Sequence, residues 1–294
     1  MRKTSVYLPD HLKAQLSALS SRTRRSEAEL VRTAIDQLVA QGAPVSIPDA
    51  DPPIPGRLVG VGVGPGAADL LTVRAVRALR RATAVVAPCT DIAAMGRAEA
   101  IVRDAVPEVA VERLVFAMTP RQKERRAALT HTAQRIIELL DHRDEVAFIT
   151  LGDPNLYSTF SSIADLVAKK RPGTPVLTVP GVMAFQELAA RAGTVLADDQ
   201  QSFLVLPANE AEANARGGAV SAALRDESCT VVIYKGGRHV EAVADRLREA
   251  DRLDGAVIGE LLGLPGERVA AVNDVADRPA SYLSSLIVPA RTQS

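Results

Sequence analysis

The stretch "VGVGVGPGAADLLT", residues 59–72, places a Gly-rich turn directly after a run of apolar residues. Gly62, Gly64 and Ala67 match the G-x-G-x-x-A pattern of loops that hold a pyrophosphate. A dinucleotide site also uses the backbone amides of the turn, and an acidic residue about 20 positions further on binds the ribose. Pro65 removes one amide, and the next predicted strand ends without an acidic residue before Asp91. The turn therefore predicts a different ligand, which approaches a backbone free of side chains.

Two further turns of this kind follow along the chain. Residues 148–160, "FITLGDPNLYSTF", run from a strand through Gly152 and Asp153 into a helix. Residues 178–193, "TVPGVMAFQELAARAG", run from a strand through a Pro-Gly turn into a helix. The carboxyl ends of parallel strands meet at one edge of a sheet, where α/β proteins bind their ligands. The three turns are therefore expected to converge on one crevice.

Strand-like and helix-like runs alternate through the body of the chain. Apolar, β-branched runs predict strands at 57–63, 83–88, 145–150, 175–179, 202–207, 229–234 and 281–289. Amphipathic runs predict helices at about 69–81, 121–141, 157–170 and 237–249. This order is typical of an α/β fold with mostly parallel sheets.

Composition limits the function classes. The chain has 294 residues, of which 47% are hydrophobic, and its 35 basic residues equal its 35 acidic ones, so any preference for nucleic acid has to be local. Cys89 and Cys229 form no C-x-x-C pair and the four histidines are scattered, so we expect buried thiols and no metal site. No apolar run approaches the roughly 18 residues of a membrane span, and no signal-peptide core is present, which predicts a cytoplasmic protein without membrane contact.

A Pro-rich linker at residues 42–56 separates a head, residues 1–41, from the body. The head alternates apolar and polar residues up to Pro9, and two helical patterns follow, the second with Ser26 as its N-cap and Glu29 three positions on. A single strand with two helices closes no core alone, so a second copy is required. This order resembles the ribbon-helix-helix DNA-binding domain.

That resemblance implies DNA binding by a dimer. It puts Lys3, Ser5 and Tyr7 toward base edges and Ser26 near a phosphate. The head carries seven basic and four acidic residues, which is a modest excess. The alternative is a dimerisation clip whose charges are merely solvated.

Further motifs in the body carry a second resemblance. They are "LVFAMT" (114–119), "YKGGRH" (234–239), "PGERV" (265–269) and "YLSSLIV" (282–288), in order with the three turns. Residues 57–289 resemble the tetrapyrrole methylases of cobalamin biosynthesis. The resemblance implies a homodimer, with lobes at 57–174 and 175–294 that bind S-adenosylmethionine between them. It implies methylation of C20 of precorrin-2.

The resemblance also assigns site residues. The expected cofactor-binding residues are Pro65, Gly152, Asp153, Leu156, Ser158, Thr159, Met183, Ala184, Tyr234, Lys235 and Leu262. The substrate is a macrocycle with many carboxylates, so basic residues should contact it, and Gly64, Gly66, Arg113, Lys235 and Arg238 are the expected substrate-binding residues. Other basic candidates are Arg121, Lys123, Arg125, Arg126 and His239, although a solvated helix face explains the first four equally well. No catalytic base is identified.

Three alternatives stay open. The body could methylate the cobalt-bearing substrate, or another ring position, because the cofactor site of such enzymes is the same. It could also serve a DNA-binding regulator that senses S-adenosylmethionine or a corrinoid. One departure from the family pattern is Ala67, where the family usually has Asp, and Asp69 is the expected substitute.

Overall fold

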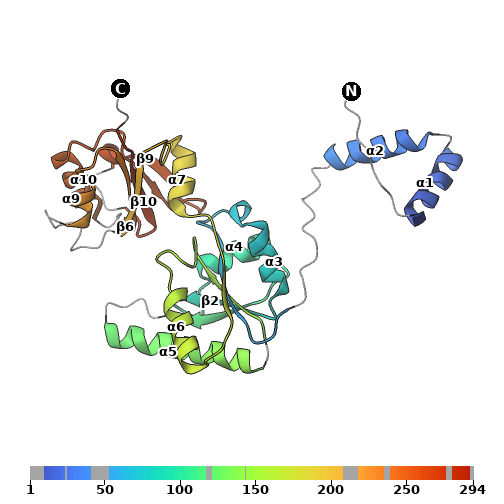
Figure 1. The fold of residues 1–294 in the computed structure, drawn as a ribbon, viewed down its shortest axis with the longest axis horizontal. Helices are drawn as coiled ribbons and strands as arrows, with labels where there is room; N and C mark the ends of the chain where they lie inside the picture. Colours follow the sequence, from blue (N-terminus) through green and yellow to red (C-terminus); the bar gives the residue numbers. More distant parts are fainter. Residues whose placement is uncertain are drawn as a thin grey trace. The chain divides into compact units, whose positions relative to one another are not determined.

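The structure is a computed structural model, and it describes residues 10–23, 25–40, 53–116, 121–142, 144–207, 218–234, 239–275 and 280–291. The chain divides into two compact units, Met1–Pro48 and Asp49–Ser294 (Figure 1). Within the described ranges, no helix has the length and the apolarity to cross a membrane.

In its described residues the first unit has two helices, α1 (Asp10–Thr23) and α2 (Glu27–Ala40). Ser26 accepts a hydrogen bond from the backbone N–H of Glu29 at 3.2 Å, which confirms it as the N-cap. The Glu27 carboxylate accepts hydrogen bonds from Lys13 and Ser17 of α1, so the two helices are tied together at this end. The expected strand, with Lys3, Ser5 and Tyr7, lies outside the described residues.

The second unit begins with a five-stranded parallel sheet in the order β3-β2-β4-β1-β5. Its strands are β1 (Leu58–Gly62), β2 (Ala84–Cys89), β3 (Val111–Val115), β4 (Val146–Thr150) and β5 (Val176–Val179). Its helices are α3 (Val73–Arg81), α4 (Arg97–Ala105), α5 (Gln122–Asp141) and α6 (Phe160–Lys170). Leu58 and Phe148 pack with Ile136 of α5 and Ile163 of α6, which cover one face of the sheet (Figure 1).

A second five-stranded sheet follows in the order β6-β7-β10-β8-β9. Its strands are β6 (Ser202–Pro207), β7 (Cys229–Tyr234), β8 (Val257–Glu260), β9 (Arg268–Ala271) and β10 (Ser284–Val288). Its helices are α7 (Ala184–Ala192), α9 (Ala219–Ala223) and α10 (Val240–Glu249). Residues of β7 alternate between the two faces, because Val231 and Ile233 join the core with α9 and α10 whereas Val232 joins the core with α7.

The α/β architecture is confirmed, with two differences from the expectation. Only the first sheet is parallel, because in the second sheet β10 pairs antiparallel with both neighbours and β8 pairs antiparallel with β9. Strand β5 follows the expected lobe boundary at 174/175 but pairs with β1, so the first sheet extends past that boundary. Cys89 and Cys229 are free and buried, as expected.

Candidate functional site

The three glycine turns meet at the carboxyl ends of β1, β4 and β5. The backbone N–H of Gly152 donates to the carbonyl oxygen of Gly64 at 2.8 Å. A Cβ atom on Gly62 or on Gly181 would clash with the carbonyl oxygen of Gly152. The glycines are therefore required because three backbones pack directly against one another, which answers why the turns lack side chains.

A fourth loop completes this contact. A Cβ atom on Gly66 would clash with the carbonyl oxygen of Leu262, and one on Gly263 would clash with the backbone nitrogen of Ala67. The loop after β8 in the second sheet therefore lies against the loop after β1 in the first. The position of Ala67 next to Gly263 also explains why a small side chain suits this place.

Asp153 ties two of the turns together. One carboxylate oxygen accepts from the backbone N–H of Asn155 at 2.8 Å, and the other accepts from that of Gly181 at 3.1 Å. Helix α6 begins later, at Phe160, whose N–H donates to the Ser158 hydroxyl. Asp153 therefore does not cap α6, because its oxygens accept from the loop between β4 and α6 and from the turn after β5.

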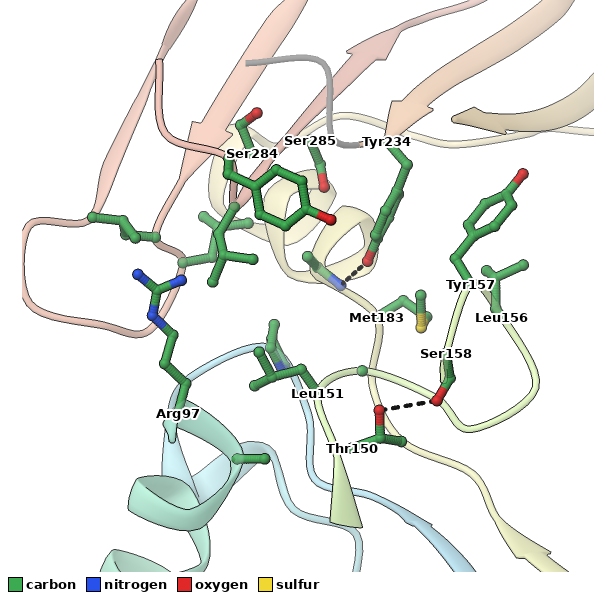
Figure 2. Close-up of a pocket in the computed structure, with 18 of the residues that line it drawn as sticks. Arg97, Thr150, Leu151, Leu156, Tyr157, Ser158, Met183, Tyr234, Ser284 and Ser285 are labelled. Atoms are coloured by element: carbon green, nitrogen blue, oxygen red, sulfur yellow. Dashed lines mark hydrogen bonds between the residues drawn. The ribbon is translucent and has the colours of Figure 1, made fainter. Parts of the chain in front are cut away.

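The converging turns border a cavity of about 280 Å³. Its lining includes most of the expected cofactor-binding residues, namely Pro65, Gly152, Leu156, Ser158, Thr159, Met183, Ala184, Tyr234 and Leu262 (Figure 2). Asp153 does not line it, and Lys235 lies outside the described residues. The sequence thus predicted residues from both sheets that the fold brings to one cavity.

Two tyrosines fix one side of this cavity. The Tyr157 hydroxyl donates to the carbonyl oxygen of Val205 at 3.1 Å, and the Tyr234 hydroxyl accepts from the backbone N–H of Ala184 at 3.3 Å. Their ring centroids are 6.0 Å apart. Burial raises the pKa of both phenols, so both remain neutral near pH 7. Neutral phenols offer hydrogen bonds and an apolar ring face to a ligand.

Hydroxyl groups supply much of the polar lining. The Thr150 and Ser158 hydroxyls lie 3.0 Å apart and hydrogen-bond to each other (Figure 2). Ser285 hydrogen-bonds to Tyr234. The Ser284 hydroxyl is buried and has no hydrogen-bond partner in the part of the chain that the structure describes. A buried hydroxyl without a partner lowers stability, and this one is closed off from the cavity.

The expected substrate-binding residues are placed differently. Gly64 and Gly66 lie in the turn that borders the cavity, whereas Lys235 and Arg238 lie outside the described residues. Arg113 does not line the cavity, because its guanidinium makes two hydrogen bonds to the buried Glu99 carboxylate, at 2.6 and 3.1 Å. Those bonds, together with the neighbouring Arg103, hold the pKa of Glu99 below its ordinary value despite burial.

Sequence reasoning missed several lining residues. They are Pro88, Arg97, Ala98, Thr150, Leu151, Gly259, Leu261, Leu264, Tyr282, Leu283, Ser284 and Ser285. The "YLSSLIV" motif already contained the last four, and the alternation of side chains along β10 could have raised Ser285 as a candidate, because Ile287 on the same face packs with Met183 and Leu262. Arg97 opens α4 and its exposed side chain extends to the cavity (Figure 2), but nothing in its local sequence marks it.

A second cavity, of about 480 Å³, lies on the other side of the segment 157–159. Tyr157, Ser158 and Thr159 line both cavities. The second cavity adds Arg125 and Arg126 of α5 and Ser162 of α6, with Phe116 and Leu129 as its apolar part.

Comparison with known proteins gives a family match and several named relatives. Residues 57–275 match the family model described as tetrapyrrole (corrin/porphyrin) methylases. The chain is 33% identical over 240 residues to the cobalt-precorrin-2 C(20)-methyltransferase of Salmonella typhimurium, covering 79% of this chain and 96% of that relative. It is 30% identical to the precorrin-2 C(20)-methyltransferase of a Sinorhizobium species, covering 80% and 95%.

Solved structures share the fold at lower identity. A cobalt precorrin-4 methyltransferase superimposes with a TM-score of 0.61 at 19% identity, covering 80% of this chain and 95% of that one. A uroporphyrin III C-methyltransferase from Thermus thermophilus gives 0.54 at 21% identity, covering 79% and 92%. On the match over residues 57–275, together with the fold, the chain belongs to the tetrapyrrole methylase family.

Proposed function

We propose that this protein transfers a methyl group from S-adenosylmethionine to C20 of precorrin-2 or of its cobalt-bearing form. The observation that carries the proposal is the cavity of about 280 Å³ formed by turns from both sheets, lined by nine of the eleven residues that the family motifs mark for the cofactor. Two relatives with about a third of their residues identical are named for C20 methylation, one of each substrate form. The expected compartment is the cytoplasm.

The lining fits the chemistry of the cofactor. Leucines and Met183 offer apolar walls, while tyrosine and serine hydroxyls offer hydrogen bonds, which is the usual make-up of a small-molecule site. When bound, S-adenosylmethionine supplies an electrophilic methyl group, so the protein has to orient two molecules and exclude water rather than provide a nucleophile.

The residues of this chain would divide that work. Glycine turns bring backbone groups next to the ligand, because no side chain stands between them. Tyr157 and Tyr234, held by their hydrogen bonds, give one wall a fixed shape. Arg97 extends to the cavity with no ion-pair partner among the described residues, and its charge suits a substrate carboxylate.

The test is product analysis. Purified protein is incubated with labelled S-adenosylmethionine and either precorrin-2 or its cobalt form, and the pigment is examined by mass spectrometry and NMR. One added methyl group at C20 is expected. Cofactor binding without methylation of either form would contradict the proposal and favour a ligand-sensing regulator.

We further propose that the head binds DNA and that the protein is a homodimer. The observation that supports the head is the pair of described helices, with Ser26 capping the second, after a segment whose sequence alternates like a strand. A gel-shift assay on the promoter of the protein's own gene tests DNA binding, and light scattering tests the dimer. A specific gel shift is expected, and its absence would refute DNA binding. Light scattering is expected to give twice the mass of one chain, and the mass of one chain would refute the dimer.

A further inference from the structure

The cavity on the α5 side of segment 157–159 carries two unmatched positive charges. Arg125 and Arg126 line it, and neither guanidinium has a hydrogen-bond or ion-pair partner in the described part of the chain. The nearest acidic residue in the sequence, Glu124, pairs with Arg121 instead, at 2.9 Å. Two adjacent guanidinium groups without a carboxylate partner form a site for an anion, since their planar N–H groups match a carboxylate.

The position of this cavity relative to the first one is fixed. Segment 157–159 separates the two, and its conformation is held by several bonds. Tyr157 has a left-handed backbone with φ of 51° and is anchored through its hydroxyl to Val205. The Ser158 hydroxyl hydrogen-bonds to the Thr150 hydroxyl and accepts from the backbone N–H of Phe160. Phe160 is the first residue of α6, and its side chain is buried in the core. A ligand on one side of the segment is therefore held close to a ligand on the other.

The two arginines also differ from their basic neighbours. Arg121 and Lys123 precede the two arginines in the same basic run. The structure describes both residues, and neither lines the second cavity. Helix α5 packs on the sheet through Ile136 and also packs on α6. The helix face that carries Arg125 and Arg126 therefore has a fixed orientation. A helix face that was merely solvated would not be expected to place two arginines against a cavity that adjoins the cofactor residues.

We propose that Arg125 and Arg126 bind carboxylate groups of the tetrapyrrole in the second cavity, while the reacting edge of the ring faces the first cavity across Tyr157–Thr159. This assignment rests on the proposed function, because it takes the first cavity as the cofactor site. It names a substrate-anchoring pair for which the sequence alone left a solvated helix face as an equal explanation.

The experiment compares two double variants, Arg125→Ala with Arg126→Ala, and Arg74→Ala with Arg77→Ala. The second pair is a matched control, because these two exposed arginines of α3 line neither cavity. KM and kcat for the tetrapyrrole, and the Kd of S-adenosylmethionine without substrate, are measured for each. The first pair is expected to raise KM by about tenfold or more, as charge-assisted hydrogen bonds predict, with the cofactor Kd unchanged. The control is expected to change neither.

A binding assay separates this proposal from the proposed function. The Kd of a stable porphyrin with eight carboxylates is measured by fluorescence quenching for wild type and both double variants, and a porphyrin with four carboxylates is the comparison ligand. Loss of eight-carboxylate binding only in the Arg125/Arg126 variant supports the anchor even if no methyl transfer is found. Equal binding by all three proteins, or an equal rise in KM in both double variants, overturns it.

Discussion

The carboxylate of Asp153 accepts a hydrogen bond from the backbone N–H of Gly181, which links the turn after β4 to the turn after β5 at 3.1 Å. Its other oxygen holds the N–H of Asn155. Replacement by Ala should lower the free energy of unfolding by about 1–3 kcal/mol, because the partly buried N–H of Gly181 loses its acceptor and the exposed N–H of Asn155 loses a hydrogen bond. Asp153→Asn should cost less, since one acceptor oxygen remains. Urea denaturation and titration calorimetry with S-adenosylmethionine measure both effects.

The comparison also tests a direct role for Asp153. If the carboxylate acts by holding Gly181, stability and cofactor affinity fall together in both variants. A loss of affinity in Asp153→Asn without loss of stability would show instead that the charge itself contacts the cofactor. Asp165→Ala, on the exposed side of α6, is the control and should change neither.

Gly66→Ala should disrupt the contact between the loops after β1 and β8. The added methyl group would clash with the carbonyl oxygen of Leu262, and this backbone atom cannot easily move away. We expect cofactor binding to be lost and the melting temperature to fall. Gly193→Asn is the control, because Gly193 is the left-handed residue at the end of α7 with open space around it, and asparagine tolerates that conformation. Full cofactor binding by Gly66→Ala would contradict the observed packing.

Glu145 should govern acid stability. Burial by itself would raise the pKa of this carboxyl, but bonds from the N–H of Ile54 and from Arg81 and Arg57 outweigh burial and hold the pKa below its ordinary value. The stabilisation is therefore present above the unfolded pKa of about 4.3 and is lost as the pH falls through the folded value. Glu145→Gln should destabilise by about 3–5 kcal/mol at pH 7, as when one member of a buried ion pair is removed.

The pH dependence provides the check. The difference in unfolding free energy between wild type and Glu145→Gln should shrink as the pH falls from the unfolded pKa of about 4.3 through the lower folded value, because the unfolded chain binds the proton before the folded chain does. The exposed pair of Glu108 with Arg80 supplies the control, since Glu108→Gln should have little effect at any pH. A difference that stays constant with pH would contradict the role assigned to the Glu145 charge.

Deletion of residues 1–41 should leave methyl transfer intact. The described residues that line both cavities belong to the unit Asp49–Ser294, and the Ile54 anchor to Glu145 remains. Equal kcat and KM for the truncated and the full chain are expected, with loss of any DNA shift. Reduced activity would show instead that the head supports the body.

Local sequence determined much of the fold. Strands β1, β2, β4, β5, β6, β7 and β10 and helices α3, α5, α6, α7 and α10 were predicted within a few residues, because their apolar periodicity is strong. Strand β3 was missed because it is an edge strand with two charged residues. Strands β8 and β9 were missed because each combines four residues with glycine or alanine, which have low strand propensity. The predicted helix at about 69–81 begins only at Val73, where Thr72 caps it by accepting from the N–H of Ala75 at 3.0 Å.

The Thr72 cap also bears on the departure from the family pattern at Ala67. Because Thr72 caps α3, the absence of Asp at position 67 does not remove the cap of this helix, and no bond from Asp69 substitutes for it in the described structure. In the structure Ala67 is the N-cap of the short 3-10 helix Ala68–Leu70, which has no side-chain cap, and it also lies at the contact between the loops after β1 and β8.

The sequence by itself determined where the chain turns and which turns lack side chains, because glycine, proline and capping residues act on the backbone within a few positions. The tertiary structure decided what each glycine makes room for, why Asp153 faces Gly181 and not a cavity, and which arginines lack a partner. Arg113 and Arg125 are both basic residues near expected substrate contacts, yet Glu99 pairs with the first and no described residue pairs with the second. The charge available at a site depends on neighbours distant in sequence, and only the folded chain brings those neighbours together.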